Sequence, residues 1–154
     1  MEALKFSSLG LYLTARLANP HGVGVWMLDK SESLFTFNEN QRFADFLPLD
    51  TETSSYVVCH DEDYVKVWYV SYGRLKATFD YSRKKIAQVV VLRDGRVLAV
   101  KTKRDKRVAL VDVATGYEKV LYEGEEEVTI VKLREHEIVL MKPRSMVFLR
   151  LPVL

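Results

Sequence analysis

The clearest pattern of hydrophobic and polar positions lies in residues 86–124. Four segments rich in Val, Ile, Leu and Tyr occupy residues 86–92, 96–101, 107–113 and 117–122. Short polar segments separate them, namely residues 93–95, 103–106 and 114–116. Since β-branched and aromatic residues favour strands and Gly and Asp favour turns, the pattern predicts four consecutive antiparallel strands in one up-and-down sheet.

This pattern recurs along the whole chain. The first strands of successive units begin at Ala3, Ala44, Ile86 and Val128, which are 41, 42 and 42 residues apart. Later strands of each unit repeat with a similar period, but the last unit offers no fourth strand. We therefore expect fifteen strands in a single domain, divided into units at residues 3–40, 44–82, 86–124 and 128–154.

Each predicted sheet is apolar on both faces. In one strand Val65 and Val67 point to one side, while Trp68 and Val70 point to the other, because successive side chains of a strand alternate. A sheet with two apolar faces is stable only when both are covered, and face-to-face stacking of repeated sheets achieves this. The predicted fold is all-β, an array of small stacked sheets; a single β-sandwich or barrel is the alternative.

The units resemble WD40-type β-propeller blades, most clearly at residues 108–112, where a strand ends in Asp and is followed by Ala114-Thr115-Gly116 and another strand. The Trp-Asp dipeptide itself is absent, because Met27 follows Trp26 and Tyr69 follows Trp68. The resemblance therefore implies a degenerate propeller-like fold of four blades, the last incomplete, without the family's hydrogen-bonded tetrad.

Four blades are fewer than most propellers of this class contain, so the ends of the array need cover. A small four-bladed ring, pairing with a second copy, or docking against another protein would each provide it. The missing fourth strand leaves a position that a partner's strand would fill. The apolar residues 146–154 predict that the last strand is covered. An oligomer is favoured.

Composition and charge narrow the class. With 154 residues, 48% of them hydrophobic, the chain can bury a core without disulfides, and its one cysteine, Cys59, has no partner within the chain. No apolar run approaches the roughly 20 residues of a membrane helix, and Glu2 and Arg16 argue against a signal peptide. We expect a soluble cytoplasmic protein.

The net charge of +2 conceals an asymmetry. Residues 1–73 contain five Lys or Arg and ten Asp or Glu, a net charge of −5, whereas residues 74–154 contain eighteen and eleven, a net charge of +7. Such a dipolar chain is expected to present an acidic and a basic edge, which would steer self-association or attract an acidic partner.

One cluster holds possible metal ligands. Cys59, His60 and Asp61 precede Glu62 and Asp63 in a turn between two strands, and His21 lies in the matching turn of the preceding unit. Two histidines and a carboxylate on one rim would suit a transition metal, although the spacing matches no established motif. The alternative is a polar hairpin turn with Cys59 facing the core. We expect no metal or other cofactor.

Enzyme signatures are missing. The sequence contains no Gly-x-Ser-x-Gly segment and no phosphate-cradling glycine loop, and the carboxylates at residues 125–127 form a solvated connection between units. We therefore expect a non-catalytic protein.

Basic residues gather where the turns between second and third strands and the connections between units share a rim. They are Arg83, Lys84, Lys85, Lys101, Lys103, Arg104, Lys106, Arg107, Lys142 and Arg144. Clustered Lys and Arg suit phosphate binding, but a solvated rim or the ion-pair networks of a heat-adapted protein give the same pattern. The first hypothesis is an interaction module or scaffold that binds a protein or a second copy of itself. Nucleic-acid binding through the basic rim is the second, and a metal-dependent enzyme using His21, His60 and Asp61 the third.

Overall fold

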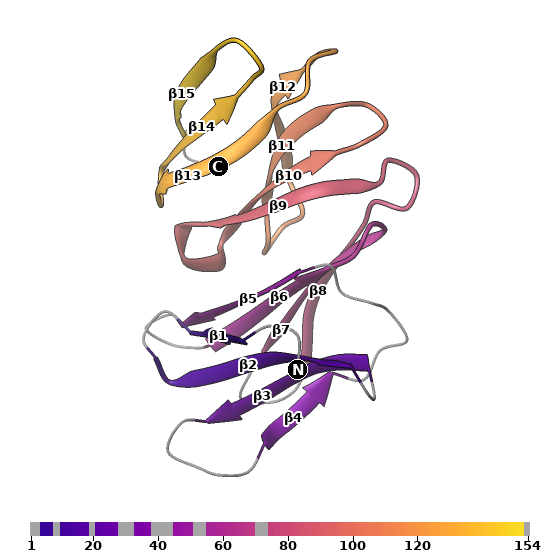
Figure 1. Cartoon of the computed structure of the whole chain (residues 1–154), viewed down its shortest axis with the longest axis vertical. Coiled ribbons are helices and arrows are strands. Elements are labelled where there is room, and N and C mark those ends of the chain that lie inside the picture. The colour runs from indigo at the N-terminus through magenta and orange to yellow at the C-terminus, as the bar shows by residue number, and fades with distance from the viewer. Residues whose placement is uncertain are drawn as a thin grey trace. The chain divides into compact units, whose positions relative to one another are not determined.

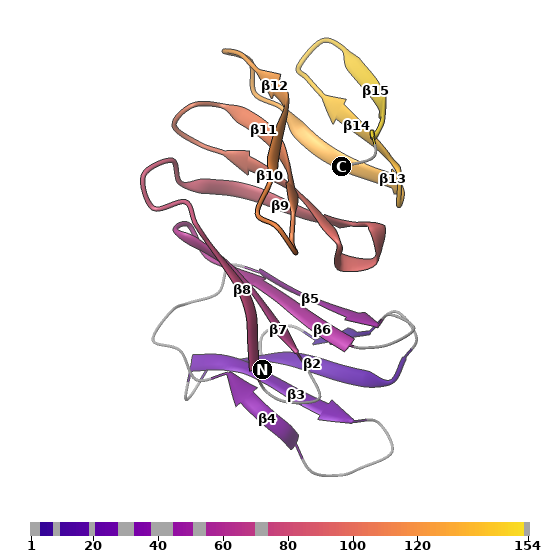
Figure 2. The same cartoon turned by 180° about the vertical axis from the view of Figure 1, so that it is seen from behind.

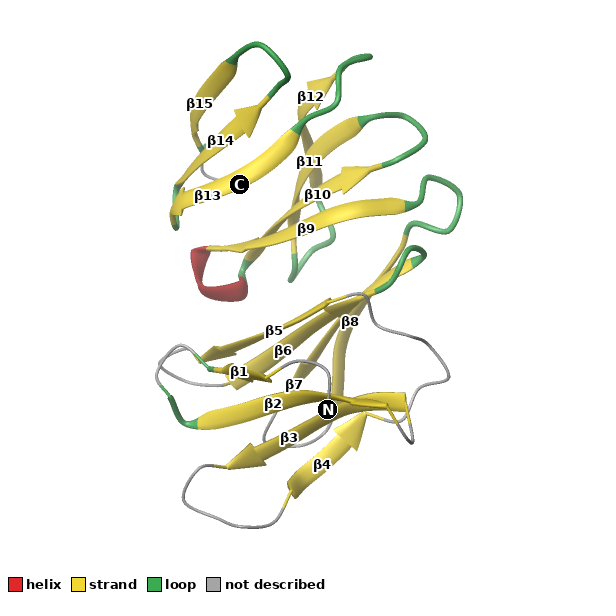
Figure 3. Cartoon of the chain, viewed as in Figure 1, coloured by secondary structure: helices red, strands yellow, loops and turns green. Residues whose placement is uncertain are grey.

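The computed structural model describes residues 4–7, 10–18, 21–27, 33–37, 45–50, 55–69 and 74–152. These residues form fifteen strands and one turn of 3-10 helix (Figure 3). The chain divides into two compact units, Met1–Phe79 and Asp80–Leu154, and each is described by itself. The prediction of a single domain over all 154 residues stays a prediction.

The first unit contains two antiparallel sheets in which strands adjacent in sequence pair with each other (Figure 1). The first sheet consists of β1 (Leu4–Phe6), β2 (Tyr12–Ala18), β3 (His21–Met27) and β4 (Ser33–Phe37). The second sheet consists of β5 (Asp45–Asp50), β6 (Ser55–His60), β7 (Tyr64–Tyr69) and β8 (Arg74–Asp80). The two sheets touch where β5 meets β1 and β2.

The second unit repeats this arrangement (Figure 2). The third sheet consists of β9 (Ile86–Leu92), β10 (Val97–Thr102), β11 (Arg107–Asp112) and β12 (Glu118–Glu123), with the turn η1 (Arg93–Gly95) between β9 and β10. The last sheet consists of β13 (Thr129–Arg134), β14 (Glu137–Met141) and β15 (Met146–Arg150). Four separate small sheets confirm the predicted all-β blade architecture, and a single sandwich or barrel is wrong.

Both faces of the central sheets are apolar and buried, as predicted. In the second sheet Val65 and Val67 are buried on one face, and Val57 and Cys59 are buried on the other. Cys59 therefore faces the core, as the alternative to a metal site predicted. A sheet that is apolar on both sides is stable only when both sides are covered.

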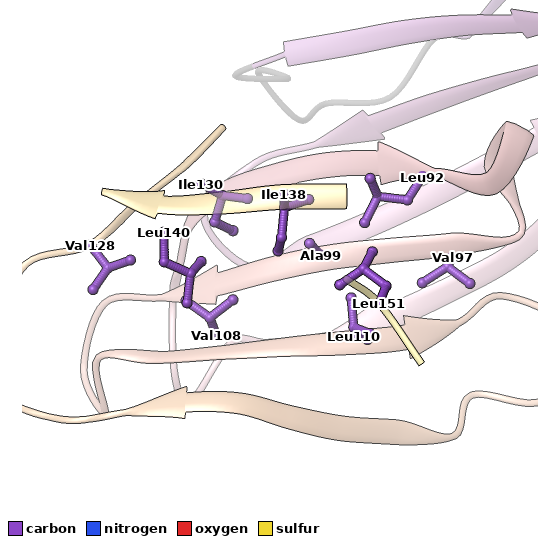
Figure 4. Packing of buried hydrophobic residues seen from close by; sticks show 10 residues of the cluster. All are labelled: Leu92, Val97, Ala99, Val108, Leu110, Val128, Ile130, Ile138, Leu140 and Leu151. Atoms are coloured by element: carbon purple, nitrogen blue, oxygen red, sulfur yellow. The ribbon is translucent and has the colours of Figure 1, made fainter. Parts of the chain in front are cut away.

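The main core of the second unit lies between the third sheet and the last (Figure 4). Fully buried Leu92, Leu110 and Ile138 belong to it, and each contributes about 1.5–3 kcal/mol by leaving water. The side-chain amide of Gln88 on β9 joins the same two sheets, because it donates to the Ile130 carbonyl at 2.8 Å and accepts from the Ile130 N–H at 2.9 Å. These contacts fix the position of the last sheet on the third.

The turns form as their residues dictate. Asp112 ends β11, and its Oδ1 accepts hydrogen bonds from the Thr115 backbone N–H at 2.8 Å and the Thr115 hydroxyl at 2.9 Å. These bonds, the backbone one foremost, lower the pKa of the Asp112 carboxyl. Gly116 then adopts a φ of 74°, which costs glycine little because it has no Cβ. Asp112 and Gly116 together set the reversal between β11 and β12.

Candidate interaction surfaces

The last sheet has one covered face and one uncovered face. Ile130, Ile138 and Leu140 point into the core against the third sheet. The opposite face, here called the forward face, carries Met141, Met146 and Phe148, with Leu133 beside them in the bulge of β13; these four side chains are between 44% and 69% exposed. Its centre is a cross-strand row of the half-buried Val131, the buried Val139 and the exposed Phe148. Large apolar side chains gathered on one exposed face are typical of an interaction surface.

The register shows what kind of surface this is. The face of the third sheet that packs on the last sheet has its own central row of Val90, Ala99 and Leu110. In each row the middle residue, Ala99 or Val139, lies at the centre of the second strand of its sheet. The side chains of both rows point in the direction from the third sheet toward the last. The forward face is thus the equivalent of a blade face that, one sheet earlier, is covered by the next blade.

A hollow of about 310 Å³ opens at one end of the forward face. It is lined by Leu133, Glu137, Ile138, Phe148, Leu149 and Arg150. Glu137 lies 3.8 Å from the Arg134 guanidinium and 4.0 Å from that of Arg150, so the hollow combines an apolar wall with a charged margin. This volume is at the small end of ligand sites and suits a large apolar side chain of a partner.

The edge of the last sheet is open as well. Among the described strands, β15 pairs only with β14, through a register that runs from Glu137 and Arg150 to Met141 and Met146. The prediction that residues 146–154 are covered holds for Leu151, which is buried, but within one copy of the chain Met146 and Phe148 are exposed. The sequence could not show this, because apolarity alone does not reveal whether the covering element belongs to the same chain.

One face of the first sheet also carries exposed apolar side chains, among the residues that the structure describes. Thr14 and Val25 are fully buried on one side of this sheet. The other side, here called the rear face, carries Leu4 and Phe6, which are 55% and 65% exposed, the half-buried Trp26 and the fully buried Ala15. The Trp26 ring lies across Gly24, where a Cβ would come within 2.4 Å of it, so glycine is needed for this packing.

The predicted basic rim is partly assembled by backbone hydrogen bonds. The Lys103 N–H donates to the Lys85 carbonyl at 2.7 Å, and the Arg104 N–H donates to the Lys84 carbonyl at 3.0 Å. The connection before β9 therefore lies against the turn between β10 and β11, as the blade pattern predicted. Arg83, Lys103 and Arg104 bring their positive charges to this place.

Several of these side chains bind groups of the protein itself. Arg104 donates to the Arg83 carbonyl at 3.0 Å, and Lys106 donates to the Glu125 carbonyl at 2.9 Å. Lys101 lies 2.9 Å from Glu127, and this hydrogen bond and charge lower the pKa of the Glu127 carboxyl.

The remaining basic residues differ in their surroundings. Lys84 lies 3.7 Å from Asp105. Lys142 lies over the Tyr122 ring at 4.8 Å from its centroid. Arg107 is half-buried, whereas Arg144, in the turn between β14 and β15, is exposed. The rim is held together largely by its own hydrogen bonds and ion pairs, and phosphate binding there stays a prediction.

The candidate metal ligands are placed as follows. The Asp61 carboxylate accepts from the backbone N–H groups of Asp63 at 2.7 Å and Tyr64 at 2.8 Å, which forms a tight turn after His60. His21 begins β3, and its side chain lies outside the described part of the structure. In that part, no group of three or more His, Cys, Asp or Glu side chains is placed to hold a metal ion. The Asp61 carboxylate thus orders the turn.

Comparison with known proteins adds the fold family. No family model and no curated protein matches the sequence. Among solved structures, the C-terminal WD40 domain of Sif2 is similar to this chain with a TM-score of 0.69 and 14% sequence identity. The match covers 98% of this chain but 46% of that one, so this chain spans about half of that domain's length. In the described residues, no helix is long and apolar enough to cross a membrane. The chain has the fold of WD40-like propeller blades.

Proposed function

We propose that this chain is a non-catalytic, propeller-type module that binds a protein, and that the forward face of its last sheet makes the contact. The observation that carries the proposal is the exposure of Leu133, Met141, Met146 and Phe148 together on one sheet face beside a hollow with an apolar wall and a charged margin. Aromatic and Met side chains are enriched at protein interfaces, and charged residues are depleted at their centres. The central row of Val131, Val139 and Phe148 meets both criteria.

The energetics favour burial of this face. Covering one large apolar side chain contributes about 1.5–3 kcal/mol, so a partner that covers Met146 and Phe148 fully would gain several kcal/mol before the cost of association. Among the described strands β15 has one neighbour, β14, so its other edge offers a place where an extended strand of a partner can bond. A sheet face and a sheet edge on the same strand make a suitable site for protein binding.

Protein binding is better supported than nucleic-acid binding. A phosphate would have to compete with the contacts of Lys101 to Glu127 and of Lys106 to the Glu125 carbonyl. The forward face requires no such rearrangement. A cytoplasmic location remains part of the proposal, and so does the absence of catalysis.

Site-specific photo-crosslinking in the source cells tests this proposal. Benzoyl-phenylalanine placed at Phe148 is expected to capture one reproducible protein, either foreign or another copy of this chain. The matched control places the same group at Val120, an exposed apolar position on β12 outside the forward face. If no protein is captured at position 148 in excess of position 120, the proposed function is wrong.

A further inference from the structure

Within the described residues, the first sheet and the last sheet each expose large apolar side chains on one face. In the second unit, one face of the third sheet packs on the inner face of the last sheet, and this contact buries Leu92, Leu110 and Ile138. The forward face of the last sheet corresponds to this face of the third sheet, but its Met141, Met146 and Phe148 side chains are exposed. The first sheet exposes the side that faces away from its buried Thr14 and Val25, with Leu4 and Phe6 upon it.

We propose that a second copy of this chain covers the forward face, by placing the rear face of its first sheet against it. This inference rests on the proposed function and names its partner. The contact would continue the stacking between the third and last sheets, with Phe6 of one copy meeting Phe148 of the other.

Charge supports this pairing of unlike ends. Residues 128–154 contain five Lys or Arg and two Asp or Glu, a net charge of +3. Residues 1–40 contain three and four, a net charge of −1. Opposite signs favour the approach of the last sheet to the first sheet of another copy, whereas two last sheets would repel each other. The charges therefore favour a head-to-tail contact over a head-to-head one.

A head-to-tail contact leaves one forward face and one rear face free in a pair of copies, and these either meet, which closes a ring of two, or add further copies. A closed pair satisfies both uncovered faces of both copies.

Light scattering after size-exclusion chromatography measures the outcome. At micromolar concentration, the wild-type chain is expected at twice its mass of 17.8 kDa. Phe148→Glu removes the forward contact and Phe6→Glu removes the rear contact, so each variant alone is expected at half the wild-type mass. Val120→Glu, which places the same charge outside both faces, is expected to retain the wild-type mass. Circular dichroism confirms that each variant folds.

Mixing the two variants is the decisive experiment. Phe6→Glu retains a forward face and Phe148→Glu retains a rear face, so an equimolar mixture is expected to recover one intact contact and form pairs. Failure of the mixture to pair, or a loss of pairing in Phe148→Glu that Phe6→Glu does not share, overturns the head-to-tail contact.

A monomeric wild-type chain also overturns it. If a foreign protein is then captured at position 148 in the cross-linking experiment, the proposed function stands and only the identity of the partner is wrong. If neither a copy nor a foreign protein is captured, both are wrong.

Discussion

Replacement of Gln88 by Ala tests how the last sheet is attached to the third. Strand β13 lies at the edge of its sheet, and the Ile130 N–H and carbonyl are both satisfied by the Gln88 amide, at 2.9 and 2.8 Å. Ile130 is buried, so water cannot easily replace the lost amide. Two net hydrogen bonds of about 1 kcal/mol each, and the added cost of unsatisfied groups, predict a loss of about 2–4 kcal/mol.

Urea unfolding followed by far-ultraviolet circular dichroism measures this loss. In a chain of this size, 2 kcal/mol corresponds to a melting temperature about 4–8 °C lower. Ala87→Ser is the matched control, because Ala87 is exposed on the same strand, and a change within about 0.5 kcal/mol is expected there. A cost at Gln88→Ala no larger than that of the control would refute the bridging hydrogen bonds.

Gln88→Glu adds a test by pH. The charged carboxylate accepts from the Ile130 N–H but has no hydrogen to donate to the Ile130 carbonyl, whereas the protonated form donates as the amide does. The pKa of the new carboxyl is therefore raised in the folded state above its unfolded value of about 4.3. Its stabilising contribution is fully present below that value and is lost as the pH rises through the folded pKa. The stability gap to wild type should narrow on acidification; a constant gap contradicts the assignment of donor and acceptor.

Three further predictions follow from the second unit. Leu110→Ala leaves a cavity at a fully buried position, so urea unfolding should show a loss of about 2–5 kcal/mol, whereas the exposed Leu133 should tolerate alanine within about 0.5 kcal/mol; equal losses would contradict the burial pattern. Asp112→Ala removes the hydrogen bonds to Thr115 and should lower the free energy of unfolding by about 1 kcal/mol at neutral pH. Because folding lowers the pKa of Asp112, this difference from wild type should be present above the unfolded pKa of about 3.9 and disappear as the pH falls through the folded pKa. A difference that does not change with pH would count against this role of Asp112. Since the rim cations bind the protein's own acceptors, the chain should elute early from heparin at physiological salt; strong, salt-sensitive retention that Arg104→Glu abolishes would restore the nucleic-acid hypothesis.

Much of the fold could be predicted because the alternation of side chains is a local property. Strand β9 (Ile86–Leu92) has the predicted limits, and the other predicted strands match the structure to within a few residues at each end. The three strands of the last sheet were also readable from the repeat. Period and turn chemistry were sufficient for these features.

The interaction surface could not be predicted in the same way. Met146 and Phe148 are as apolar as the buried Leu110 and Val108, and only the arrangement of sheets distinguishes a face that is covered by the next blade from one that is not. The partners of Arg104 and Lys106 are backbone carbonyls, which carry no signal in the sequence. The cluster of basic residues therefore predicted a binding rim, but the sequence could not show how many of its side chains already bond to groups of the protein itself.

The position of Cys59 gives the molecule an internal reporter. It is the only thiol in the sequence, and it is fully enclosed in the second sheet. Both tryptophans, Trp26 and Trp68, also precede residue 80, so thiol labelling and tryptophan emission follow the opening of the same half of the chain. The rate at which a thiol reagent modifies the native protein thus measures how often the surroundings of Cys59 open to solvent.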